Sequence, residues 1–120
     1  MHVYNKQIVT AAVMNATINS AAYNVQQIYG VAIQAVFTGT PTGTFKLQAS
    51  CDVATSYQPN GDPVVNWTDI IDSPYSVTAA GDYMWNVFDV MFNYIRLVYV
   101  DASGGTSTAV LNVRINAKAP

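Results

Sequence analysis

The sequence is poor in charged residues and in the side chains that most often carry out chemistry. Lysine, arginine, aspartate and glutamate make up 10% of the 120 residues, and glutamate does not occur. Ordinary soluble domains contain about 25%. A catalytic triad would have to use His2, the only histidine, and an acid–base pair would have to come from aspartates, which here lie beside turn-forming residues. We therefore expect no enzymatic activity.

Cysteine and long apolar runs are also scarce. Cys51 is the only cysteine, which excludes an internal disulfide and a zinc site built on cysteines. Because it is in phase with Phe45 and Leu47, we interpret Cys51 as a small buried hydrophobic residue. No apolar stretch approaches the ~18 residues of a membrane span, and no signal peptide is visible. These absences predict a soluble protein that is made in a cytoplasm and does not enter a membrane.

The net charge and the hydrophobic content restrict the partners. A formal net charge of −2 without a basic patch predicts no binding to nucleic acid. Hydrophobic residues make up 51% of the chain, so there are too few charges to cover a free monomer in the usual way. Neighbouring copies or other proteins would cover part of such a surface. We expect a homo-oligomer.

The residues that are present favour β-structure. The chain contains sixteen valines, eight isoleucines and eleven threonines but only three leucines, and β-branched residues are enriched in strands. Apolar and polar residues alternate in several segments, here given by number: 29–37, 44–51, 93–100 and 109–118, with weaker patterns in 6–14, 16–25, 75–78 and 83–88. Glycine-rich turns at 38–44 and 101–108 predict two hairpins, each joining the two strong segments that flank its turn. The fold prediction is a single all-β domain over residues 1–120, a two-sheet antiparallel sandwich or jelly roll of about eight strands.

One loop, in the stretch "SYQPNGDPVVNWTDI", gathers candidate site residues. Asp52, Asp62 and Asp69 flank or occupy it, and loop carboxylates can bind calcium in jelly rolls. They lack a compact D-x-D-x-D spacing, so turn formation explains them better. We predict that the protein has no metal and no cofactor. The alternative is a calcium site formed by these three aspartates.

Aromatic residues near the same loop leave a second question open. Tyr57, Trp67 and Tyr75 would form a stacking surface for a sugar if their rings were exposed. A tryptophan at the start of a strand also commonly covers the open end of a sandwich core. We favour this packing role for Trp67 and expect Trp85 to pack similarly.

Two motifs resemble those of discoidin-like (galactose-binding-like) jelly rolls. The segments "ASCD" and "NWTDI" look like a loop of those domains stretched by an insertion, and "NYIRLVYV" looks like one of their last strands. The whole chain resembles small tailed-phage virion proteins more closely, through "YNKQ", "IQAVFTGTPTGT", "NWTDI", "YIRLVY" and the C-terminal "LNV". Cys51 and the long loop after Asp52 depart from the pattern of those proteins.

The resemblance implies a structural virion protein. Its expected role is decoration of a capsid or attachment to it as a cement, head-fibre or collar component, made in the host cytoplasm and located on the virion. Its partners would be major capsid or portal and tail proteins, and it would form a homo-oligomer, with a trimer as first choice. The alternative is a carbohydrate-binding module for attachment to host or mucus glycans.

Overall fold

The computed structural model describes residues 2–52 and 66–120, and these form strands and the connections between them. The strands are β1 (His2–Val13), β2 (Ile18–Asn19), β3 (Tyr23–Asn24), β4 (Gly30–Phe37), β5 (Gly43–Ser50), β6 (Thr68–Asp69), β7 (Tyr75–Val77), β8 (Gly81–Phe88), β9 (Tyr94–Asp101) and β10 (Val110–Ala119). Tyr57 and Asp62 lie outside the described residues. No helix that could span a membrane occurs in the part of the chain described.

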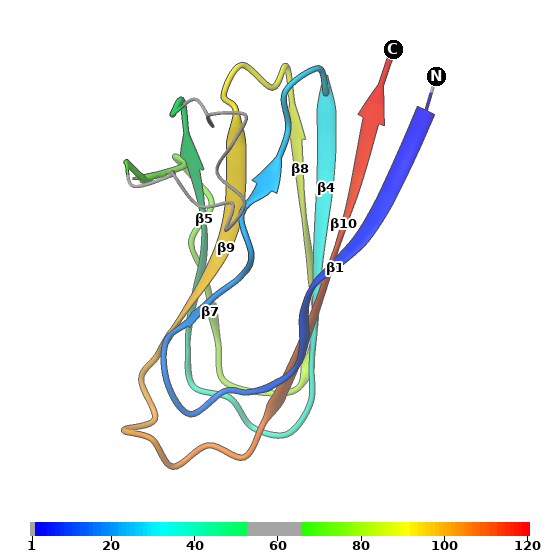
Figure 1. Cartoon of the computed structure of the whole chain (residues 1–120). Helices are drawn as coiled ribbons and strands as arrows, with labels where there is room; N and C mark the ends of the chain where they lie inside the picture. Colours follow the sequence, from blue (N-terminus) through cyan, green and yellow to red (C-terminus); the bar gives the residue numbers. More distant parts are fainter. Residues whose placement is uncertain (1, 53–65) are drawn as a thin grey trace.

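The strands form two antiparallel sheets that face each other (Figure 1). The first has four strands in the order β1-β10-β4-β8. The second has six, with β2-β9-β5-β6 as its main path, β3 paired to β9 and β7 paired to β5. The predicted all-β sandwich is confirmed. The sequence predicts about eight strands, and the described residues contain ten. Three of these, β2, β3 and β6, are only two residues long.

Alternation along the long strands fills the space between the sheets. Ile33 on β4, Leu47 on β5 and Leu97 on β9 are almost completely buried, whereas their immediate neighbours along each strand point to the outer face of the sheet. Phe45 lies at the centre of this core, where its ring centroid is 4.9 Å from that of Tyr99 and 5.9 Å from that of Trp85. The core thus joins both sheets through aromatic contacts, each adding to the free energy gained by burial.

Both predicted hairpins are wrong. β4 and β5 are joined by the predicted turn but lie in different sheets, and so do β9 and β10. The weaker segments 6–14 and 16–25, which follow each other in the chain, do not pair with each other either. β1 pairs with β10, and both β2 and β3 pair with β9. Alternation fixes which face of a strand is buried and does not fix its partner, so a turn signal between two such strands fits an arch between sheets equally well.

The two arches support each other at one end of the sandwich. Thr38 N–H donates to the carbonyl of Val110 at 3.0 Å, and Ala102 N–H donates to the carbonyl of Thr42 at 2.8 Å. Gly39 has φ +73°, and a Cβ there would lie 3.1 Å from Ala109 Cα, so the crossing requires glycine. These cross-arch bonds satisfy backbone groups that a hairpin would have used.

The expectation that Cys51 is buried is also wrong. β5 ends at Ser50, so Cys51 no longer follows the alternation of the strand and its side chain is exposed. Its carbonyl accepts a hydrogen bond from Asn93 Nδ2 at 3.1 Å.

Candidate functional site

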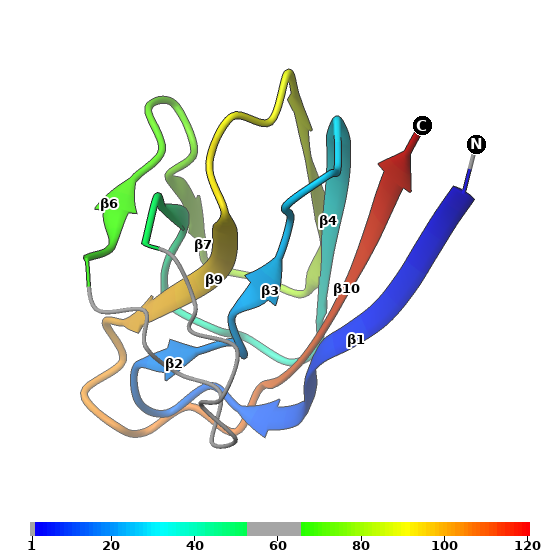
Figure 2. The same cartoon turned by 45° about the horizontal axis from the view of Figure 1, so that its top comes forward.

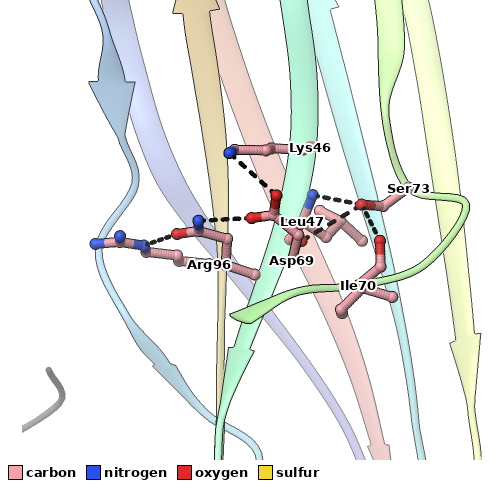
Figure 3. A network of polar contacts seen from close by, with 7 residues as sticks. Lys46, Leu47, Asp69, Ile70, Ser73 and Arg96 are labelled. Carbon is pink, nitrogen blue, oxygen red and sulfur yellow. Dashed lines mark hydrogen bonds and ion pairs between the residues drawn. The ribbon is translucent and has the colours of Figure 1, made fainter. Parts of the chain in front are cut away.

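A row of polar side chains crosses the outer face of the six-stranded sheet and includes the candidate residue Asp69. Gln48 on β5 lies opposite Arg96 on β9 and opposite Asp69 on β6. Arg96 Nε donates to Gln48 Oε1 at 2.9 Å, and Gln48 Nε2 donates to Asp69 Oδ1 at 2.8 Å. Lys46 Nζ pairs with Asp69 Oδ2 at 3.2 Å (Figure 3). We call Lys46, Gln48, Asp69 and Arg96 the polar row.

Asp69 is the charged acceptor of the polar row. Hydrogen bonds from Gln48 and then from Lys46 lower the pKa of its carboxyl below the ordinary value. Asp69 is therefore ionised at neutral pH, and each of its oxygens already accepts a hydrogen bond. A carboxylate held in this way suits the pinning of β6 to β5 better than it suits proton transfer, which requires a pKa nearer the working pH.

Trp67 extends the polar row rather than the core. The guanidinium of Arg96 lies 4.3 Å from the centre of its ring, and the side chain is half-buried. Because Arg96 points away from the core, this cation–π contact places Trp67 on the outer face of the sheet. The interpretation that Trp67 covers the open end of the core is wrong. Trp85 is the buried tryptophan, and its Nε1 donates to the carbonyl of Ser73 at 2.7 Å.

Ser73 connects the segment after the polar-row residue Asp69 to the buried strand β5 by hydrogen bonds. Its buried Oγ accepts the N–H of Leu47 at 3.0 Å and donates to the carbonyl of Ile70 at 2.7 Å (Figure 3). The hydroxyl is thus both donor and acceptor to backbone groups, and its hydrogen-bond partners among the described residues include no acid or base. Ser73 holds the β6–β7 connection against β5 and β8, which is a structural role.

Asp52 and Asp69, the two aspartate candidates that the structure describes, have different hydrogen-bond partners. Asp52 accepts hydrogen bonds from the backbone N–H of Asn66 at 3.0 Å and from Asn66 Nδ2 at 2.9 Å, which brings together the two ends of the described chain around the loop. Asp69 belongs to the polar row. Within the described ranges, no group of three or more His, Cys, Asp or Glu side chains could hold a metal ion.

Tyr75, the third aromatic candidate, is part of an aromatic stack. Its ring lies 3.7 Å from that of Tyr83 and nearly parallel to it, and Tyr83 contacts Trp85 edge to face at 4.8 Å. One face of the Tyr75 ring is therefore covered by β8. The stack links the two sheets where β7 faces β8.

A cleft at the opposite end from the arches was not anticipated from the sequence. It has a volume of about 410 Å³ and lies between the first strand and the segment that follows β3. Its lining consists of Tyr4, Tyr23, Asn24, Gln26, Gln27, Ile28 and Ala119. We call it the terminal cleft, because Tyr4 and Ala119, near the two ends of the chain, belong to its lining. The first and last strands reach these ends side by side (Figure 2). The dense tyrosine and amide run "YNVQQIY" is the one sequence signal that could have indicated it.

Comparisons with known proteins show similarity of fold. No protein-family model matches the chain, and no curated protein sequence does. The solved structure of the SPBc2 prophage-derived protein YomS matches with a TM-score of 0.60 and 10% sequence identity, over 97% of this chain and 92% of that one. PirA matches with a TM-score of 0.53 and 15% identity, over 97% and 93%. The coat protein of Tobacco streak virus matches with a TM-score of 0.50 and 10% identity, over 99% and 86%.

These similarities cover nearly the whole length of each compared chain. A similar sandwich therefore occurs in a prophage-derived protein and in a viral coat protein. At 10–15% identity the matches establish the fold alone.

Proposed function

We propose that this protein is a structural component of a bacteriophage particle, attached to the head as a cement, head-fibre or collar protein, and that it has no catalytic activity. It would be made in the host cytoplasm and assembled on the virion. Its partners would be further copies of itself and the major capsid or portal and tail proteins.

The outer face of the four-stranded sheet is the observation that carries this proposal. Val3, Val36, Met84 and Phe88 point outward there and are exposed by 58%, 43%, 48% and 75%. Monomeric proteins seldom gather large apolar side chains on one flat surface. Such a surface is typical of a protein that is permanently bound to other proteins.

The polar residues of this face favour contact with a protein. Asn5 Nδ2 donates to Asn116 Oδ1 at 2.6 Å, and Arg114 donates to Asn5 Oδ1 at 2.7 Å and to Gln7 Oε1 at 3.2 Å. These contacts hold the amides flat between the strands. A face with few charges and with mutually bonded amides has a low cost of desolvation, as the central part of an interface requires.

The size of the face also fits. Four strands about 4.8 Å apart and about 26 Å long present roughly 500 Å² per copy. Two such faces together reach the ~1,000 Å² expected of a specific interface. From the sequence alone, the outward rows of the alternating strands predict an interface that includes Gln34, Gln48, Asn112 and Arg114. Gln34, Asn112 and Arg114 lie on this face, whereas Gln48 lies on the outer face of the other sheet.

The comparisons point in the same direction. YomS is described as prophage-derived, and the Tobacco streak virus protein is a coat protein, so this fold occurs in viral proteins. The motif resemblance to small tailed-phage virion proteins independently suggests the same class.

The test is incorporation into particles. Phage that encodes the chain is purified on a density gradient, and its proteins are identified by mass spectrometry and by labelling of intact particles. We expect the chain in stoichiometric amounts on the particle surface, reduced by Met84→Lys and retained with Val100→Lys, which adds the same charge on the outer face of the other sheet. Particles that lack the wild-type chain would refute the proposal.

A further inference from the structure

The terminal cleft lies where the two sheets separate. β1 and β10 continue toward the chain ends, and β3 with the residues after it faces them from the other sheet (Figure 2). Tyr4 on β1 and Ala119 on β10 form one wall. Tyr23 on β3 and the turn 24–28 form the other. Its volume of about 410 Å³ falls within the range of ~300–1,000 Å³ that is typical of small-molecule sites.

The turn that forms this second wall is fixed by local hydrogen bonds. Asn24 Oδ1 accepts the backbone N–H of Gln26 at 2.9 Å, and Ile28 N–H donates to the carbonyl of Val25 at 3.1 Å. Val25 itself is buried in the core. Gln27 has φ +65°, an uncommon conformation for a residue that is not glycine. The turn therefore presents Gln26 and Gln27 from an anchored backbone.

The amides of the cleft differ from Asn5, Gln7 and Gln48 on the sheet faces in what they contact. On the sheet faces, Asn5, Gln7 and Gln48 all have side-chain hydrogen bonds within the chain. In the cleft, the side chains of Gln26 and Gln27, the amide nitrogen of Asn24 and the hydroxyls of Tyr4 and Tyr23 have no hydrogen-bond partner among the described residues. These groups are available to bind the hydroxyls of a ligand.

The lining carries no charge at neutral pH. No lysine, arginine, aspartate, glutamate or histidine belongs to it. Burial, and secondly the neighbouring Tyr4, raises the pKa of Tyr23, so its phenol remains neutral. His2 approaches only from outside, with its ring centroid 6.3 Å from that of Tyr4. An anion would find no cation here, and a metal ion would find no carboxylate.

We propose that the terminal cleft binds a neutral saccharide. Two tyrosine rings supply apolar surfaces against which the C–H faces of a sugar pack. Side-chain amides beside them donate to and accept from its hydroxyls. This inference does not depend on the proposed role in a virion, and its site does not include Trp67, which lies against Arg96 on the outer face of the six-stranded sheet.

The full-length chain should be screened on an array of neutral and acidic glycans, followed by titration calorimetry with the best neutral hit. Maltose, lactose and chitobiose serve as soluble probes in saturation-transfer NMR. We expect neutral glycans to bind. A negative charge on an acidic glycan should not increase its affinity. Tyr4→Ala and Gln26→Ala should each weaken binding about tenfold, the effect of removing one good contact.

Matched controls separate the cleft from other sites. Tyr29→Ala removes a tyrosine exposed by 40% that does not line the cleft, and Gln34→Ala removes an exposed amide from the outer face of the four-stranded sheet. Both should bind as the wild type does, and thermal melting should show that all four variants are folded. Absence of binding to every neutral glycan would overturn the inference. So would binding that the two cleft variants leave unchanged, because the site would then lie elsewhere.

Discussion

At the scale of single residues, the two tryptophans provide a direct comparison of burial with surface contact. Trp85 is buried, donates a hydrogen bond to Ser73 and contacts Phe45, whereas Trp67 is half-buried against Arg96. Trp85→Ala should lower the free energy of unfolding by about 3–5 kcal/mol, as truncation of a buried aromatic does. Trp67→Ala should lower it by about 1 kcal/mol or less.

Urea denaturation followed by far-ultraviolet circular dichroism measures both variants, since each has lost a fluorophore. A larger loss for Trp67→Ala than for Trp85→Ala would contradict the placement of the two rings.

Tyr99 offers a second prediction at this scale. Its ring is completely buried, and its hydroxyl has no hydrogen-bond partner in the described part of the chain. A buried polar group without a partner costs stability, so Tyr99→Phe should raise the free energy of unfolding by about 1 kcal/mol.

The same hydroxyl predicts a pH dependence. Burial, and then the nearby carboxylate of Asp101, raises the pKa of Tyr99 above the ordinary value of 10.0. The unfolded chain therefore loses this proton first as the pH rises. The contribution of Tyr99 to stability is complete below pH 10 and is lost above it. Melting curves at pH 8 and above pH 10 should show a smaller alkaline loss for Tyr99→Phe, and an equal loss in both proteins would refute the assignment.

At the scale of the elements, the arches determine which strands become neighbours. Gln34 on β4 lies opposite Met84 on β8, whereas Gln48 on β5 lies on the other outer face of the sandwich. In a Cys51→Ser background, the double variant Gln34→Cys/Met84→Cys should form an intramolecular disulfide, because side chains directly opposite each other have Cβ atoms about 5 Å apart.

The control is Gln34→Cys/Gln48→Cys, which should remain reduced under the same mild oxidation. Mass spectrometry of the alkylated monomers distinguishes the two outcomes. A disulfide in the control alone would restore the hairpin that the sequence suggested and contradict the observed topology.

At the scale of the whole molecule, the exposed face of the four-stranded sheet predicts self-association. We expect light scattering to give an oligomeric mass for the isolated chain, with a trimer as first choice. Met84→Lys should shift the mass toward the monomer, since it places a charge within the proposed interface. Val100→Lys, at a residue exposed by 42% on the outer face of the other sheet, should leave it unchanged.

A wild-type chain that is monomeric at every accessible concentration would contradict the prediction of self-association. Incorporation of that monomer into particles would then mean that the particle supplies the symmetry.

The sequence alone determined the class of fold and which face of each long strand is buried. Alternation places Ile33, Leu97 and Leu111 inside and Gln34, Arg96 and Asn112 outside, because successive side chains of a strand point to opposite faces. Tertiary structure decided which strands pair. Burial of one face is satisfied by any partner of the right pattern, so the turn signals predicted hairpins where the chain instead crosses between sheets. Pairing of β1 with β10 and of β3 with β9 also brings Tyr4 to Tyr23 across the terminal cleft. No local pattern specifies that meeting, since it depends on the separation of two sheets built from distant segments.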